Sequence, residues 1–342
     1  DLTPSETAAL ERRNIAALVT AHGSAISHTA ILAHSMNIPT VIGIGDEFLA
    51  NIRPGEQALV DGFSGEVILE PDAGILSKLT APQEKSTDTS EGTHTADGTH
   101  VSIYSADDPC APLPEYADGI AVFGCPLLGD ETKQYEYYRA IAERTPDCRA
   151  IIRMPVISPK DPDRQIKYDQ QIRAVFRAAS HGEPGILFPM ITSVPEARKI
   201  LAACDDAKME LRAEGVKCSE NVKIGFMVEI PAAAIISDCL APMADFFIID
   251  SDSIARHTLA CYEEDCFSPD FADGQLEAVM RLIGNSARNA VKNGARIGIC
   301  GSLAGDTSLT GDFLRMGIDN FCVTPDRLAE VRKRVTEVDL EV

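Results

Sequence analysis

The stretch "GILFPMITSVPEARKILAACDDAKMELRAEGVKCSENVKIGFMVEI", residues 185–230, places one long helical pattern between two short apolar runs. Pro195 lies in the first turn of the helical pattern, and Gly215 follows its last turn, which are the positions these residues favour. An apolar run, a helix and a second apolar run are typical of two parallel strands joined by a crossover helix. The stretch therefore predicts a β–α–β unit.

Apolar runs of the same kind recur along the rest of the chain, with helical stretches between most of them. The runs are residues 100–106, 118–124, 150–157, 185–191, 223–230, 245–252, 296–302 and 320–325. A second long helix is expected over 273–294, closed by Gly294. Eight such strands alternating with helices predict an α/β fold with a (β/α)8 TIM barrel, and a span of about 240 residues fits that fold.

The barrel prediction also says where chemistry belongs, because active sites of this fold lie at the carboxyl ends of the strands. The residues at those ends are Arg153, Pro189, Met190, Glu229, Asp250 to Ser253, Cys300, Ser302 and Thr324.

The amino-terminal region has a different pattern. It reads as a strand over 14–20, a helix over 27–36, a strand over 39–45 and a hairpin over 57–71. Residues 80–99 are polar and have no apolar period, which is typical of a linker. We therefore expect three parts: a small β/α domain over 1–79, a linker over 80–99 and the barrel over 100–342.

Composition limits the partners. The chain holds 31 Lys and Arg against 52 Asp and Glu, a net charge of −21, so no basic face for nucleic acid is expected. No apolar stretch is long enough to span a membrane. The ten cysteines are scattered without a C-x-x-C pair, which favours reduced thiols in a cytoplasmic protein over disulfides. A small anionic substrate remains compatible with a local cluster of Arg or Lys.

A glycine-led loop, "GSAISHTAILAHS" at 23–35, brings His28 to the first turn of the expected helix. A helix N-terminus favours bound anions and a neutral imidazole, whose lone pair can attack phosphorus. Ser27 and Thr29 can add hydroxyl donors to a phosphate there. The simpler interpretation, in which His28 only caps the helix, stays open. A metal site is the poorer interpretation, because His22 and His34 each stand six residues from His28.

The loop is also a family motif. "GSAISHTAILAHSMNIPTVIG" at 23–43 resembles the phosphohistidine loop of the phosphoenolpyruvate-utilising enzymes. Four further segments are similar to the enzyme I family of the bacterial sugar phosphotransferase system: "DLTPSETA" at 1–8, "FPMITSVPEAR" at 188–198, "GFMVEIPAAA" at 225–234 and "CGSLAGD" at 300–306. The resemblance implies a swivelling phosphohistidine domain followed by a phosphoenolpyruvate-binding barrel.

The resemblance also implies roles for single residues. It makes His28 the phosphoryl acceptor, Arg153 a substrate ligand, Glu229 a ligand of Mg2+ and Cys300 the donor of a proton to the enolate carbon. It further implies a small phosphocarrier protein as partner and a homodimer formed through the barrel. Each residue has a simpler role as well: Arg153 as a structural ion-pair partner, Glu229 as a helix cap and Cys300 as a small buried residue.

The chain departs from the family at several positions of the same site. A family arginine at the end of the second barrel strand is Gly124, and another after the sixth strand is Glu263. The family's Asn-Asp pair is Asp252 and Ser253, which removes a metal carboxylate unless Asp252 replaces it. The glutamate of the family's Cys-Gly-Glu is Ser302.

These losses predict a degenerate substrate and metal site, because each concerns the binding of one trianionic substrate and its Mg2+. Two alternatives remain open. Beside the leading prediction, an enzyme I-like phosphotransferase that transfers a phosphoryl group through His28, these are a non-catalytic regulatory or binding relative of the phosphotransferase system and a barrel adapted to another small anion. In the second case Arg153, Arg256 and His257 would line the pocket.

Overall fold

A computed structural model covers the 342-residue chain, and its contacts divide it into two units, Asp1–Thr87 and Asp88–Val342. The expected domain boundaries at 79 and 99 stay a prediction. The structure describes residues 15–22, 38–46, 48, 52–53, 55–61, 65–71, 92–106, 113–114, 116–145, 149–182, 184–219, 221–260 and 272–340.

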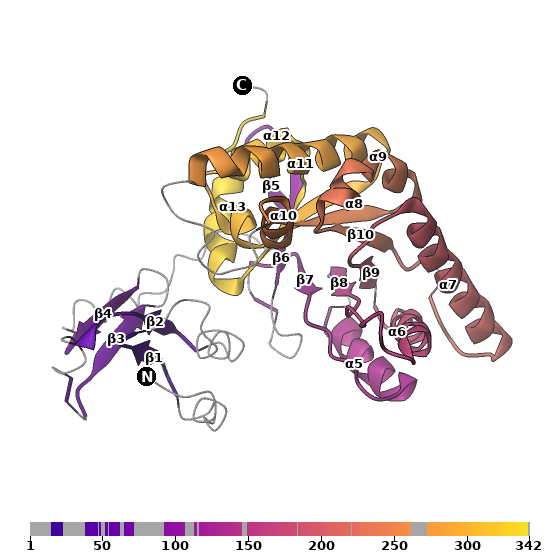
Figure 1. Ribbon diagram of the computed structural model, residues 1–342, viewed down its shortest axis with the longest axis horizontal. Coiled ribbons are helices and arrows are strands. Elements are labelled where there is room, and N and C mark those ends of the chain that lie inside the picture. The colour runs from indigo at the N-terminus through magenta and orange to yellow at the C-terminus, as the bar shows by residue number, and fades with distance from the viewer. Residues whose placement is uncertain are drawn as a thin grey trace. The chain divides into compact units, whose positions relative to one another are not determined.

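The second unit is a closed barrel of parallel strands, which confirms the predicted fold class (Figure 1). Neighbours along the chain pair with one another from β6 to β13, and β13 pairs with β6 to close the sheet. The strands are β6 His100–Ser105, β7 Gly119–Val122, β8 Arg149–Arg153, β9 Pro184–Phe188, β10 Ile224–Val228, β11 Phe246–Asp250, β12 Arg296–Cys300 and β13 Asn320–Val323.

Helices surround this barrel. They are α5 Glu131–Arg144, α6 Arg164–Ala178, α7 Val194–Ala213, α8 Pro231–Ile235, α9 Ser237–Leu240, α10 Ser251–Thr258, α11 Ala272–Lys292, α12 Thr310–Arg315 and α13 Leu328–Glu337. Short 3-10 helices cover Ala241–Met243, Ser302–Gly305 and Pro325–Arg327. The two long helices expected from the sequence are α7 and α11. The hydroxyl of Ser193 caps α7 by accepting a hydrogen bond from the N–H of Glu196.

Part of the linker expected over 80–99 is folded, although its polar composition is typical of a segment with little structure of its own. Thr93–His94 form β5, which pairs antiparallel with β6. A tight turn joins the two strands: the N–H of Thr99 donates to the hydroxyl of Thr95, and Gly98 has a φ of 89°. The Asp-Gly pair at 97–98 is a turn signal that the polar composition obscured.

One ring of side chains, one from each strand, packs in the middle of the barrel interior. This interior ring comprises Tyr104, Ala121, Ile151, Leu187, Met227, Ile248, Cys300 and Cys322, all buried. Because side chains alternate along a strand, the intervening residues face the helices, where they form the larger apolar core.

Six cysteines of the described residues are free thiols: Cys125, Cys204, Cys218, Cys239, Cys300 and Cys322.

The first unit contains the strands expected from the sequence. β1 Leu18–Thr20 and β2 Thr40–Ile42 are parallel, and β3 Ala58–Asp61 and β4 Glu66–Leu69 form the hairpin. The helix expected over 27–36 lies outside the described residues. Across the described helices of both units, none combines the length and the apolar character needed to cross a bilayer.

Three neighbouring helices, α5, α6 and α7, are joined by an arginine of α6 (Figure 1). Arg173 contacts Glu131 at 2.7 Å, Glu210 at 3.0 Å and Glu214 at 2.6 Å, and Arg177 contacts Glu131 at 2.6 Å. Burial acts to raise the pKa of Glu131, but hydrogen bonds from the two arginines outweigh it and hold that pKa below its ordinary value.

We expect Glu131→Gln to lower the free energy of unfolding at neutral pH by about 1–3 kcal/mol, because it removes a charged acceptor from two arginines. The lowered pKa makes this stabilisation complete above the pKa of the unfolded glutamate. It is lost as pH falls through the lower pKa of the folded state. Urea denaturation of both proteins at neutral pH and at descending acidic pH measures the difference, which should shrink on acidification.

Glu143→Gln is the matched control, because the ion pair between Glu143 and Arg139 is exposed and lies within α5. Its effect should stay within about 0.5 kcal/mol. An equal loss in the two variants, or a loss at Glu131 that does not depend on pH, contradicts the assignment.

Candidate functional site

Four of the sequence-predicted site residues come to one end of the barrel. Arg153 is the last residue of β8, Glu229 follows β10, Asp252 lies in the first turn of α10 after β11, and Cys300 ends β12. The carboxyl ends of parallel strands share one mouth, so these side chains surround a common space. His28, Ser27 and Thr29 lie outside the described residues, and their roles stay predictions.

Glu229 and Arg153 form a nearly buried ion pair. Nη2 of Arg153 lies 3.0 Å from Oε2 of Glu229, whose side chain is only 3% exposed. The Nε of Arg153 lies 3.0 Å from Sδ of Met227. The other carboxylate oxygen, Oε1, accepts the N–H of Met190 at 2.6 Å. The ion-pair role that the sequence left open for Arg153 is therefore present in the structure.

Met190 reaches Glu229 through an uncommon backbone conformation. Its φ is 57°, in the left-handed region that a non-glycine residue seldom adopts. The sequence places Met190 at the mouth but gives no signal for this hydrogen bond, because a backbone donor has no side-chain signature.

Two acidic residues organise the start of α10. Asp250 caps the helix by accepting the N–H groups of Asp252 and Ser253 at 3.1 and 3.0 Å, and it accepts the Ser253 hydroxyl at 2.7 Å. Asp252 accepts the N–H of Ser302 at 3.0 Å and also its hydroxyl. Ser253 and Ser302, two positions that depart from the family, thus each donate to a neighbouring carboxylate.

Gly301 makes the contact between Asp252 and Ser302 possible. It has a φ of 91°, and a Cβ at this position would lie 2.5 Å from Oγ of Ser251 and 2.8 Å from Oδ2 of Asp252. Only glycine tolerates this conformation and this approach.

The observed arrangement does not fit a Mg2+ ion. Every carboxylate oxygen of Glu229 and Asp252 already accepts a hydrogen bond from the protein, and one oxygen of Glu229 also forms the ion pair with Arg153. Among the residues that the structure describes, no group of three or more His, Cys, Asp or Glu side chains is placed to hold a metal. Mg2+ requires carboxylate oxygens that are available for octahedral coordination.

Cys300 is buried and neighbours both acidic residues. Burial raises the pKa of its thiol well above the usual range, and Asp250, Cys322 and Asp252 raise it further, while Arg153 acts in the opposite direction. The thiol is therefore protonated at neutral pH. This state suits a proton donor, and it also suits a small buried residue.

His257 links α10 to the end of β10. Its Nδ1 lies 2.8 Å from the carbonyl oxygen of Ser253 and 3.0 Å from that of Glu229. Because carbonyl oxygens only accept, Nδ1 carries the proton. The sequence suggested His257 only as part of a pocket for another anion. Its contact with Glu229 depends on how α10 packs against β10, which the sequence does not display.

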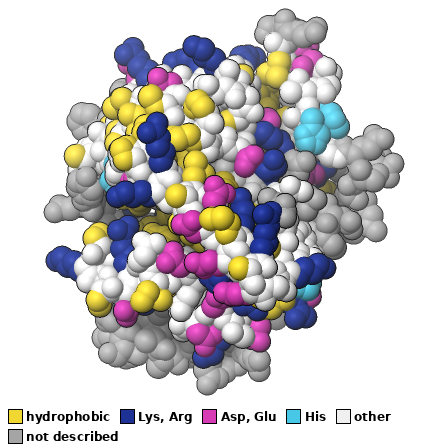
Figure 2. Space-filling view, turned by 90° about the vertical axis from the view of Figure 1, so that its right-hand side faces the viewer, with side chains coloured by type: hydrophobic (Ala, Val, Ile, Leu, Met, Phe, Trp, Pro, Cys, Tyr) yellow, Lys and Arg dark blue, Asp and Glu magenta, His cyan; other side chains and the backbone are white. Residues whose placement is uncertain are grey.

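Gly124, at the position of the family's second-strand arginine, follows the carboxyl end of β7. A Cβ built there meets no atom within 4 Å, so the space of the missing side chain is open. On the face shown in Figure 2, Asp and Glu side chains lie among Lys and Arg, and no broad basic area is seen.

Two family models match the chain. The model of the PEP-binding domain of PEP-utilising enzymes matches residues 130–340, and the model of the mobile domain of these enzymes matches residues 1–65. PEP is phosphoenolpyruvate.

Relatives extend the match to almost the whole chain. The phosphoenolpyruvate-protein phosphotransferase of Priestia megaterium is 30% identical over 380 residues, which cover 99% of this chain and 66% of the relative. The phosphotransferase of the same name from Haloferax volcanii is 29% identical over 378 residues, with 99% of this chain and 66% of the relative covered. The chain thus spans just under two thirds of the length of these relatives.

A solved structure supports the fold alone. Haloferax volcanii malate synthase in its lead(II) complex is 13% identical, with a TM-score of 0.50, over 74% of this chain and 76% of that one. The match to the PEP-binding domain covers more than half of the chain and includes every barrel strand from β8 to β13. The chain therefore belongs to the PEP-utilising enzymes.

Proposed function

We propose that this chain is an enzyme I-like phosphoryl-transfer protein. In this proposal His28 takes the phosphoryl group of phosphoenolpyruvate at the barrel mouth and passes it to a small phosphocarrier protein in the cytoplasm. The observation that carries the proposal is the convergence of Arg153, Glu229 and Cys300 at one mouth. The similarity to phosphoenolpyruvate-protein phosphotransferases along 99% of the chain supports it. A homodimer formed through the barrel belongs to the same proposal.

The chemistry needs one nucleophile and one proton. The imidazole of His28 forms a bond to phosphorus, and the bond from phosphorus to the enol oxygen breaks, which leaves the enolate of pyruvate. Protonation of the enolate carbon completes pyruvate. The Cys300 thiol holds a proton at neutral pH because burial disfavours its thiolate. The thiolate then regains a proton from solvent.

The mouth is expected to hold the substrate weakly. Arg153 would contact the anion, with the hydroxyls of Ser27 and Thr29, but the charge of its guanidinium is compensated by Glu229. The open space at Gly124 lacks a second cation. The acidic groups of Asp250 and Asp252 lie close by. Because each missing charge contact with a desolvated anion typically costs a few kcal/mol, we propose slow turnover.

A second candidate function is a regulatory or binding relative without turnover. The specific observation in its favour is that Glu229 and Asp252 already accept donors from Arg153, Met190 and Ser302. Because the charged and polar groups of this mouth hydrogen-bond to one another, the mouth is stable without a bound substrate. A barrel for another small anion at Arg153, Arg256 and His257 is a variant of this candidate.

Labelling of His28 tests the first proposal. We expect phosphoenolpyruvate with a radioactive phosphoryl group, supplied with Mg2+, to label the protein slowly, with saturation only at millimolar donor. The adduct should be acid-labile and should be abolished by His28→Ala. His22→Ala is the matched control and should label normally, since His22 pairs with Asp46 in the same unit.

Label on another residue contradicts the role of His28. No label, together with no heat of binding at millimolar phosphoenolpyruvate, contradicts the enzyme and supports the binding relative.

Gly124→Arg should strengthen binding of phosphoenolpyruvate about tenfold, because it adds a cation beside the anion in open space. Its backbone is outside the left-handed region, so the substitution is unstrained. Calorimetric titration measures the change. Leu127→Arg adds the same charge at a nearby exposed position and should have little effect. Equal affinities for the two variants would place the substrate elsewhere.

Cys300→Ala should slow pyruvate formation roughly a hundredfold, since a positioned acid supplies about that factor. Cys322→Ala is the matched control, because Cys322 is the neighbour of Cys300 in register on β13 and also belongs to the interior ring. Pyruvate released in a coupled assay is the readout, with urea denaturation of both variants beside it. Equal loss of stability and of rate in the two variants would leave Cys300 a packing residue only.

A further inference from the structure

Half of the inward positions at the amino-terminal end of the barrel interior carry no side chain. Two residues before each member of the interior ring, a strand points its side chain inward again. On four strands this position is a glycine: Gly119, Gly185, Gly225 and Gly298. A TIM barrel is ordinarily filled by successive layers of bulky side chains. Here four of the eight side chains of the first layer are absent.

One aromatic ring uses part of the vacated space. Phe246, two residues before Ile248 on β11, lies over two of these glycines. A Cβ at Gly225 would overlap the Phe246 ring, and a Cβ at Gly185 would lie 3.1 Å from it. The glycines therefore allow Phe246 to lie across β9 and β10.

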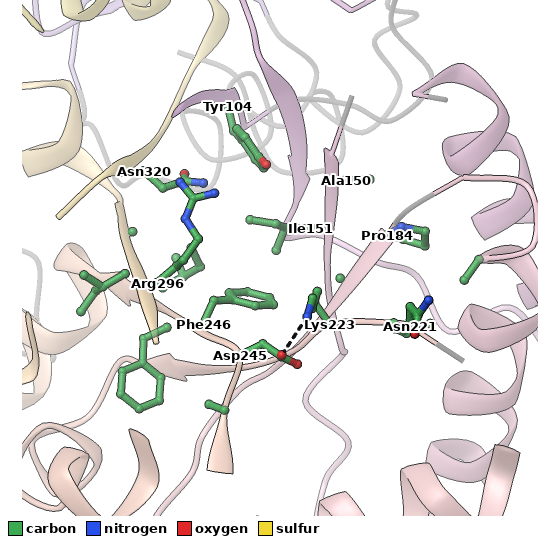
Figure 3. A pocket seen from close by; sticks show the side chains of 18 of the residues that line it. Tyr104, Ala150, Ile151, Pro184, Asn221, Lys223, Asp245, Phe246, Arg296 and Asn320 are labelled. Atoms are coloured by element: carbon green, nitrogen blue, oxygen red, sulfur yellow. Dashed lines mark hydrogen bonds and ion pairs between the residues drawn. The ribbon is translucent and has the colours of Figure 1, made fainter. Parts of the chain in front are cut away.

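A cavity of about 880 Å³ lies at this end of the barrel (Figure 3). Residues from the starts of β8 to β13 line it, at the end opposite to Arg153 and Glu229. Ile151 and Phe246 give it an apolar wall, and Tyr104 of the interior ring also lines it. Its volume is in the range of small-molecule sites.

Hydrogen-bond donors gather on one side of the cavity. Figure 3 shows the guanidinium of Arg296 beside the amide of Asn320. Arg296 contacts Oδ2 of Asp319 at 3.2 Å and the Ser102 hydroxyl at 3.3 Å. Asn320 is only 8% exposed, and its amide oxygen accepts the weak donor Sγ of Cys322. Within the described part of the chain its amide nitrogen donates to no acceptor, so this N–H group is available to a ligand.

A second cation lies at the cavity rim. Lys223 pairs with Asp245 at 3.1 Å and is largely exposed. The other oxygen of Asp245 accepts the N–H of Ile224 at 2.9 Å, so this carboxylate is engaged on both sides. Lys223 and Arg296 have more N–H donors than these contacts use, and the remaining donors favour an anionic ligand over a cationic one.

We propose that this amino-terminal cavity binds a small organic carboxylate with an aromatic or branched apolar body. The carboxylate accepts hydrogen bonds from Arg296 and the amide nitrogen of Asn320, and the apolar body packs against Phe246 and Ile151. The site is separate from the mouth at Arg153, and it does not depend on the phosphoryl chemistry proposed above.

Calorimetric titration with phenylacetate tests the site. 2-Phenylethylamine and benzyl alcohol present the same ring with a cationic or neutral head. We expect phenylacetate to bind at least about tenfold more tightly than either. Arg296→Gln should lower the affinity for phenylacetate by about tenfold or more, while Arg296→Lys should keep part of that affinity. Arg139→Gln, an exposed position on α5, is the control and should leave it unchanged.

Backbone amide shifts give a readout that does not require a substituted protein. Phenylacetate should change the backbone amide chemical shifts of Gly185, Gly225 and Gly298 and leave those of the residues beside Arg153 unchanged. Equal affinity for the three probes overturns the proposal. Shifts confined to the opposite mouth, or an Arg296→Gln protein that is folded and binds normally, overturn it as well.

Discussion

The barrel mouth depends on one nearly buried carboxylate. A charge with so little access to water is stable only when its oxygens are paired. Glu229 meets this requirement with the guanidinium of β8 on one oxygen and the backbone of Met190 on the other. Its own carbonyl oxygen accepts from His257 of α10. Four parts of the chain that are distant in sequence are therefore held in register by a single residue.

The barrel was readable from the sequence because eight apolar runs alternate with helical patterns, and the rule that chemistry lies at strand ends located Arg153, Glu229 and Cys300. β5 was not readable, because its residues are polar and its stability comes from pairing with β6. The conformation of Met190 and the contact between Asp252 and Ser302 were also hidden. Both depend on how separate loops pack, and no local pattern encodes that packing.

The positions that depart from the family are related to one another. Ser302 donates to Asp252, and Ser253 donates to Asp250, so each hydroxyl compensates a neighbouring acidic group. A carboxylate in place of Ser253 would lie against Asp250, where two negative charges repel. A single substitution at Ser253 would therefore not restore the family's metal site. The hydrogen bonds explain why Ser253 and Ser302 occur together with Asp250 and Asp252.

Closure of the barrel by β13 and β6 brings the two ends of the second unit together. The N–H of Ala96, in the turn before β6, donates to the carbonyl oxygen of Val338 at 2.9 Å. A chain whose ends touch can be cut elsewhere and rejoined there without loss of a strand pairing. A circularly permuted gene would therefore begin synthesis at a different strand and still encode the same barrel, with the same strand pairings.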